Sequence, residues 1–173
     1  MKKRLLASLL AAMMMASMMV TTAFAAEPET TGEPEIHCIT LDAADLLALD
    51  RETYKTVTPS LGLSSGSGWS IPVTANFSTI PAGATVTKVK VSPGKVSYSG
   101  PITSVIGVSA FRLTSPDGDS TDLSFSTVGM ETTAFNGYTA RGTWKLSIFG
   151  THAGSGYGVI KYTNTKITIW YTT

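Results

Sequence analysis

The chain of 173 residues has little of what enzymes usually need, with one cysteine, two histidines and 14% charged residues. Cys38 has no second cysteine to pair with, so an intrachain disulfide is excluded and the fold must rely on an apolar core. His152 is the only histidine in the C-terminal two thirds, and no serine lies in the glycine pattern of a nucleophile elbow. The sequence therefore predicts a protein that is not an enzyme, with a hydrolase as a distant alternative.

The first 25 residues have the three parts of a secretory signal peptide. Lys2, Lys3 and Arg4 form a basic start, an apolar run covers residues 5–20, and Ala-Phe-Ala ends at residue 25. An uncleaved anchor is the alternative, but the apolar run is short for a membrane-spanning helix. No later run is long and apolar enough to span a bilayer. We expect residues 1–25 to be removed and the mature chain to be secreted.

The charge is distributed unevenly once the signal peptide is set aside. Residues 26–60 contain eight acidic and two basic residues, whereas residues 61–173 contain four acidic and eight basic residues. Such asymmetry allows the basic part to attract anionic polymers, or the acidic part to bind its own domain. Scattered lysines on strands also protect sheet edges and keep a protein soluble, which is the simpler interpretation.

The segment between the signal peptide and residue 68 is predicted to lie outside the main domain. Residues 26–35 are acidic, contain proline and lack large apolar groups, which is typical of a disordered tail. Asp42 is a candidate cap for a short helix that carries Leu46, Leu47 and Leu49. Residues 62–68 have the composition of a serine- and glycine-rich linker. We therefore assign residues 26–67 to an acidic tail, a short helical or irregular segment and a linker.

From residue 68 onward the pattern is that of an all-β protein. Apolar and polar residues alternate over short stretches that are separated by turn-forming glycine, proline and asparagine. The predicted strands cover residues 69–77, 86–91, 95–98, 105–114, 123–125, 144–149 and 158–171, with an interruption near Asn164. The sequence thus predicts a two-sheet antiparallel β-sandwich, jelly-roll-like, over residues 68–173. Its core should contain inward-pointing Trp69, Trp144, Leu146, Ile167 and Ile169. By alternation Ile71, Val73, Ala75 and Phe77 share the half-buried face of the first strand with Trp69.

Four motifs in the last third of the chain occur in a recognisable order. Ser-Pro-Asp-Gly at 115–118 is followed by Phe-Asn-Gly at 135–137, by Gly-Thr-Trp-Lys-Leu-Ser-Ile at 142–148, and by a strand pattern at 162–171. This order resembles the P domain, a galactose-binding-like β-sandwich that follows the catalytic domain of kexin-like subtilases. The resemblance implies a non-catalytic module, since the P domain packs on a protease and stabilises it. The printed sequence has no protease domain ahead of the sandwich, so we expect a free-standing accessory role.

Trp170 is the first candidate for a binding residue. By alternation it shares a face with Lys166 and Thr168, opposite Ile167 and Ile169. An aromatic residue on an outer face is a stacking platform for a sugar ring or an anchor in a protein interface. A third interpretation is that the leucines at 46–49 fold back and cover it. The exposed basic residues expected to assist binding are Lys145, Lys161 and Lys166.

Asp117, Asp119 and Asp122 crowd around one turn and raise the question of a calcium ion. Carboxylates that repel one another are relieved by a hard cation. The spacing does not match an EF-hand loop, and Asp-Gly at a hairpin is explained by turn geometry alone. We expect a structural turn first and a calcium site second, with no other cofactor.

Two functions from different classes follow from these observations. The first is a secreted, non-catalytic β-sandwich that binds or stabilises a partner protein, which is exported and, by the resemblance, a protease. The second is a module that binds a glycan of the cell envelope through Trp170 and the basic strands. No nucleic-acid partner is expected.

Overall fold

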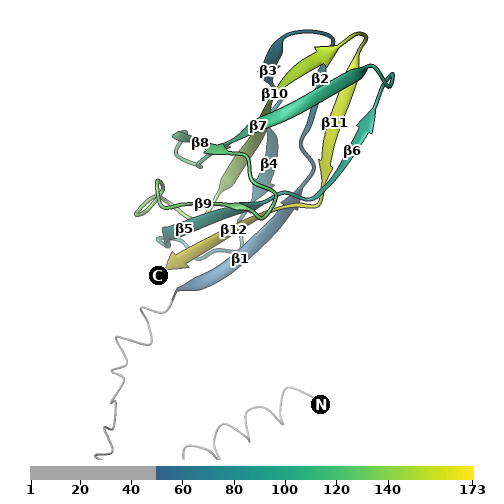
Figure 1. Ribbon diagram of the computed structural model, residues 1–173. Coiled ribbons are helices and arrows are strands. Elements are labelled where there is room, and N and C mark those ends of the chain that lie inside the picture. The colour runs from purple at the N-terminus through teal and green to yellow at the C-terminus, as the bar shows by residue number, and fades with distance from the viewer. Residues whose placement is uncertain (1–49) are drawn as a thin grey trace, which may run out of the picture. The chain divides into compact units, whose positions relative to one another are not determined.

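The computed structural model describes residues 50–173, which form an all-β fold of antiparallel sheets (Figure 1). Within this range no helix is long and apolar enough to cross a membrane. The strands are β1 (Arg51–Val57), β2 (Ser60–Leu63), β3 (Ser67–Trp69), β4 (Val73–Asn76), β5 (Thr85–Ser92), β6 (Lys95–Ser99), β7 (Ser104–Thr114), β8 (Ser120–Ser124), β9 (Met130–Thr132), β10 (Thr143–Gly154), β11 (Gly158–Thr163) and β12 (Thr165–Thr172).

These strands form three sheets. The four-stranded sheet has the order β1-β12-β5-β9, and the three-stranded sheet has the order β2-β11-β6. The five-stranded sheet has the order β3-β10-β7-β8, with β4 also paired to β10. β1 and β12, the first and last strands, lie side by side (Figure 1). The predicted all-β, antiparallel fold is therefore confirmed.

One cluster of buried apolar side chains joins the three sheets. Val89 and Ile169 enter it from the four-stranded sheet, Phe111 and Leu146 from the five-stranded sheet, and Ile160 from the three-stranded sheet. All five are completely shielded from solvent. In a β-sandwich each sheet buries one face against another sheet. A single core to which every sheet contributes is therefore typical of a sandwich.

Trp144 is the largest fully buried side chain of this core. Its indole N–H donates a hydrogen bond to the carbonyl of Ala140 at 3.1 Å, and Phe135 packs against its ring edge-on with centroids 5.1 Å apart. A buried indole needs such a hydrogen-bond partner, because an unpaired polar group is costly in an apolar core. The predicted inward positions of Trp144, Leu146, Ile167 and Ile169 are confirmed.

The turns follow local backbone chemistry at two predicted places. The N–H of Gly118 donates to the carbonyl of Ser115 at 3.1 Å, and Gly118 has a φ of 98° that side chains rarely tolerate. Asn164 has a φ of 60° and separates β11 from β12. Asparagine tolerates this left-handed conformation better than most residues, which explains the interruption predicted there.

The strand predicted over residues 69–77 is wrong in its continuity and in part of its orientation. β3 and β4 both pair with β10. Trp69 lies opposite Phe149 and Val73 lies opposite Leu146, so four residue positions on the β3–β4 side match only three on β10. This one-residue shift reverses the alternation, so Trp69 lies on the outer face while Ala75 stays inside. Ile71, predicted to be inside, is 86% exposed.

Ser70 compensates for the broken ladder. Its N–H donates to the carbonyl of Ile148 at 2.8 Å, and its hydroxyl accepts the N–H of Ile148 at 3.0 Å. Pro72 has no N–H to offer to a ladder, which favours an interruption at this point.

The sandwich also begins earlier than predicted. β1 and β2 lie within residues assigned to the segment before the domain, yet they pair with β12 and β11. The boundary at residue 68 is therefore too late. β9 was not predicted either, since three residues are too few for a visible alternation. The predicted short helix, the acidic tail and the signal peptide lie outside the described residues.

Candidate functional site

Trp170 and Lys166 lie on the outer face of the four-stranded sheet. Trp170 is in register with Glu52 on β1 and with Lys88 on β5. Thr168 is in register with Tyr54 on β1 and with Lys90 on β5. We name this surface the aromatic–lysine face and define it by Tyr54, Lys88, Lys90, Glu131, Lys166 and Trp170. Tyr54 is 54% exposed, whereas Thr168 is buried beneath these longer side chains.

Two cation–π contacts order the aromatic–lysine face. The Nζ atom of Lys88 lies 4.3 Å from the centroid of the Trp170 ring, and that of Lys166 lies 3.9 Å from the centroid of the Tyr54 ring. Both distances are within the range in which an ammonium group is attracted to the negative face of an aromatic ring. Each of the two rings thus has a lysine ammonium group over one of its faces.

Glu131 on β9 completes the charge pattern. Its carboxylate lies 3.0 Å from Nζ of Lys90 and 3.7 Å from Nζ of Lys88. The hydrogen bond from Lys90 and then the charge of Lys88 hold the pKa of Glu131 below its usual value. Lys88 thus lies between Trp170 and Glu131, and the face keeps an excess of positive charge.

Lys145 and Lys161, the other predicted binding residues, do not join this face. Lys145 is exposed on β10 of the five-stranded sheet, and Lys161 is exposed on β11 of the three-stranded sheet. The structure therefore places Lys166 and Trp170 on one face of β12 and the remaining two lysines on other sheets. The leucine segment that we considered as a cover for Trp170 lies outside the described residues.

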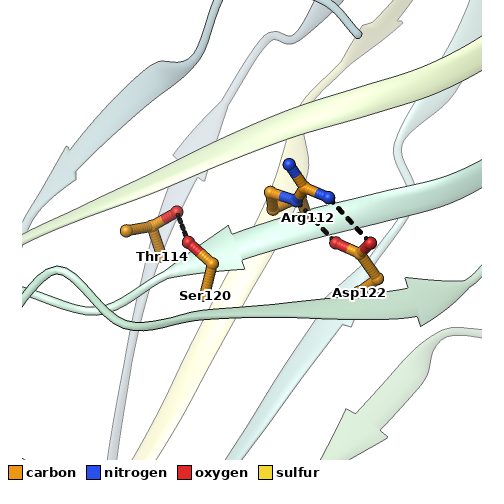
Figure 2. Close-up of polar contacts among 4 residues, drawn as sticks. All are labelled: Arg112, Thr114, Ser120 and Asp122. Carbon is orange, nitrogen blue, oxygen red and sulfur yellow. Dashed lines mark hydrogen bonds and ion pairs between the residues drawn. The ribbon is translucent and has the colours of Figure 1, made fainter.

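The three aspartates considered for calcium do not converge. The carboxylate of Asp117 accepts the N–H of Thr139 at 3.3 Å, and Asp119 is exposed. Asp122 is held by Arg112, whose Nε and second guanidinium nitrogen donate to its two oxygens at 2.6 and 2.9 Å (Figure 2). Within residues 50–173 no group of three or more acidic, histidine or cysteine side chains is placed to hold a metal ion. The structure thus offers these aspartates no common metal site.

The Arg112–Asp122 pair shapes the outer face of the five-stranded sheet. The hydrogen bond from Arg112 lowers the pKa of Asp122, and the same bond raises the pKa of Arg112. Thr114 and Ser120 form a second cross-strand pair, their hydroxyl oxygens 2.8 Å apart, further along β7 and β8 (Figure 2). The guanidinium of Arg112 also covers the ring of Trp69, 4.1 Å from its centroid.

One histidine lies among the described residues, and it is buried. Nε2 of His152 lies 2.8 Å from the hydroxyl oxygen of Ser104, and the His152 N–H of the main chain donates to the carbonyl of Gly66 at 2.7 Å. Within residues 50–173, no acidic side chain forms a hydrogen bond or ion pair with His152 to orient its second nitrogen. This pair has the chemistry of a satisfied core histidine.

Sequence reasoning missed Tyr54, Lys88, Lys90 and Glu131 as neighbours of Trp170. The available signal was the alternation of Glu52, Tyr54 and Thr56, which we had assigned to the segment before the domain. Their closeness to Trp170 depends on strand pairing, since β1 and β12 are more than a hundred residues apart in the chain.

Comparisons with known proteins give weak structural similarities and no match to a family. No family model and no curated protein matches the chain. Two of the solved structures that are similar to it come from Aeromonas sobria. The crystal structure of the Aeromonas sobria serine protease in complex with its chaperone has 14% sequence identity and a TM-score of 0.42. The alignment covers 71% of this chain and 27% of that chain. The crystal structure of the serine protease of Aeromonas sobria has 15% sequence identity and a TM-score of 0.40. Here the alignment covers 73% of this chain and 29% of that chain.

The chain thus spans less than a third of each matched chain. At these TM-scores neither similarity establishes a shared role.

Proposed function

We propose that the protein is an exported, non-catalytic accessory module that binds a partner protein through the aromatic–lysine face. The proposal combines an N-terminal pattern typical of secretion, motifs that resemble the P domain, and a sandwich with an ordered aromatic surface. The observation that carries it is the pair of outward-facing rings, Tyr54 and Trp170, each with a lysine ammonium over it.

Aromatic anchors of this kind suit protein interfaces. Tyrosine and tryptophan dominate interface energies because they bury a large area at a small cost in side-chain entropy. The contacts of Lys88 and Lys166 with the two rings favour the orientations that the rings already have on the free surface, which lowers this cost. The lysine stems lie along the same face and add apolar contact area.

The charges of the face specify the chemistry of the partner. Lys88, Lys90 and Lys166 outnumber two carboxylates, that of Glu131, which is already paired, and that of Glu52, which lies in register with Trp170. An exported protein with an acidic surface patch is the complementary partner, and a protease is the class that the P-domain resemblance suggests. Electrostatic complementarity would steer the encounter and make the association sensitive to salt.

The absence of catalysis is part of the proposal. The Ser104–His152 pair is the nearest approach to a nucleophile and a base within residues 50–173, and His152 is buried beside the core. Catalytic pairs need access to substrate and a third group that orients the base.

The test is capture of exported proteins from the host on the immobilised chain, residues 26–173. A genuine partner should be lost with Trp170→Ala and with Tyr54→Ala, each by at least tenfold in affinity. Lys145→Ala is the matched control, since Lys145 is an exposed lysine on another sheet. Binding should weaken as salt rises, because charges are screened beyond about 8 Å at physiological ionic strength. A partner that both aromatic variants retain would contradict the proposal.

The alternative, an envelope glycan bound by Trp170 together with all three predicted lysines, has less support at this face. Lys145 and Lys161 lie on other sheets, so the three side chains do not line one binding strip. Lys88 also covers one side of the Trp170 ring. Retention of purified wall polymer by the native chain, lost in Trp170→Ala, would favour this alternative.

A further inference from the structure

A second surface feature lies away from the aromatic–lysine face. It is a cleft of about 390 Å³ between the edge strand β2, the connection from β3 to β4, and the start of β11. We name it the Trp69–Tyr157 cleft. Its lining has no carboxylate, ammonium, guanidinium or imidazole group. The lining residues are Ser60, Leu61, Gly62, Trp69, Ser70, Ile71, Pro72, Val73, Tyr157 and Val159.

The lack of a side chain at Gly62 leaves space for the ring of Tyr157, which forms part of the cleft. A Cβ atom at position 62 would overlap the hydroxyl of Tyr157, so the ring lies directly against the backbone of β2. Tyr157 is nevertheless 60% exposed, and Ile71, which is also part of the lining, is 86% exposed. An exposed ring and an exposed aliphatic side chain thus face solvent at the same cleft.

Trp69 forms a fixed part of the lining. Its ring packs against Phe149 with centroids 5.1 Å apart, and Arg112 covers it from a distance of 4.1 Å. Arg112 is itself fixed by its two hydrogen bonds to Asp122 (Figure 2). This chain of contacts preorganises the cleft, which lowers the entropy lost when a ligand binds.

The cleft also has polar groups that strand pairing leaves free. The carbonyl of Pro59 accepts the N–H of Tyr162, and Leu61 lies opposite Ile160, so these residues direct their backbone groups toward β11. Ser60 and Gly62 alternate with them and direct theirs toward the open edge of β2. Among the described strands β2 pairs with β11 alone. Ser60 and Tyr157, which are both part of the lining, also carry hydroxyl groups.

We propose that the Trp69–Tyr157 cleft binds an uncharged sugar, such as a neutral disaccharide or the end of a neutral glycan. Sugar rings present C–H groups that pack on aromatic and aliphatic side chains, and hydroxyl groups that match free backbone donors and acceptors. The lining lacks the ionic groups that an acidic sugar requires. An extended peptide is less suitable, because only Ser60 and Gly62 direct backbone groups outward from this four-residue strand.

This site is independent of the proposed protein partner, because it lies on different sheets from the aromatic–lysine face. Its test uses residues 26–173 on an array of neutral and acidic glycans, followed by calorimetry with cellobiose, N,N′-diacetylchitobiose and lactose. Proline-rich and extended peptides serve as competing probes. We expect binding to at least one neutral glycan, and no preference for acidic glycans or peptides.

Tyr157→Ala should weaken that binding at least tenfold. Gly62→Ala should weaken it as well, by displacing Tyr157. Tyr98→Ala is the matched control, because Tyr98 is a similarly exposed tyrosine on β6 that is not part of the cleft. If Gly62→Ala alters folding, Tyr157→Ala still decides the question, since an exposed ring contributes little to stability.

Absence of binding to every neutral glycan would overturn the proposal. So would equal binding by the Tyr157→Ala and native chains, or a preference for a peptide or an acidic glycan. Trp170→Ala should leave sugar binding unchanged, and this separates a failure here from a failure of the proposed protein interface.

Discussion

The hydroxyl oxygen of Ser104 on β7 lies 2.8 Å from Nε2 of His152 on β10. The two residues are brought together by the pairing of β7 with β10, in which Ser104 lies opposite Gly154 and Ile106 lies opposite His152. The pair therefore supplies a partner to a buried imidazole at one end of the five-stranded sheet.

Ser104→Ala should destabilise the fold by about 1–3 kcal/mol, because the buried imidazole loses its hydrogen-bond partner. Urea unfolding measures this loss. Ser109→Ala is a suitable control, since Ser109 is an exposed serine on the same strand. A panel of ester, peptide and glycoside substrates should show no turnover with the native chain. Turnover that disappears in Ser104→Ala would show that the pair is catalytic.

Trp144→Ala should destabilise the fold by about 3–5 kcal/mol, because it removes a fully buried ring and leaves a cavity. Trp170→Ala, on the outer face, is the matched control and should cost far less. Both are measured by thermal and urea unfolding. Similar losses for the two variants would mean that the orientation of β10 or β12 is reversed.

Asp122→Asn should lower stability at neutral pH and make it less sensitive to acid. The pKa of Asp122 is lowered in the folded state by the hydrogen bond from Arg112, so its contribution is present above its unfolded value near 3.8. That contribution is lost as the pH falls through the folded pKa. The difference between variant and native melting temperatures should therefore shrink in acid.

Asp119→Asn is the control for this titration, since Asp119 is exposed on the same turn. A difference between the Asp122→Asn and native chains that stays constant from neutral to strongly acidic pH would contradict the assigned ion pair.

Tyr162 should titrate anomalously at high pH. Burial, and then the nearby Tyr98, raise the pKa of its hydroxyl to about 12. Because the unfolded tyrosine ionises near 10, the stabilisation is complete below that pH and is lost as the pH rises toward 12. Ultraviolet titration should show one late tyrosine that is missing in Tyr162→Phe. A late tyrosine that persists in this variant would refute the assignment.

Cleavage of the exported chain should fall after Ala25, because small residues at 23 and 25 follow the apolar run. Mass spectrometry of the secreted protein should find Ala26 as its first residue. Exported material that still begins at Met1 or Lys2 would contradict a cleaved signal peptide.

Several parts of the fold could be predicted from the sequence because they depend on residues that are adjacent in the chain. The alternation of Trp144, Leu146 and Ile148 predicts a strand with one buried face, and the structure buries all three. The turn at 115–118 and the break at Asn164 follow from the conformational preferences of proline, glycine and asparagine. Each of these features needs only a few adjacent residues to specify it.

The tertiary structure decided what depends on contacts between distant segments. A one-residue shift against β10 places Trp69 outside, although the local alternation predicted it inside. Tyr54 and Lys88 become neighbours of the face that carries Trp170 only through the pairing of β1 and β5 with β12. Alternation determines which residues share a face of one strand. The register between strands, set by the packing of the whole core, determines which faces meet.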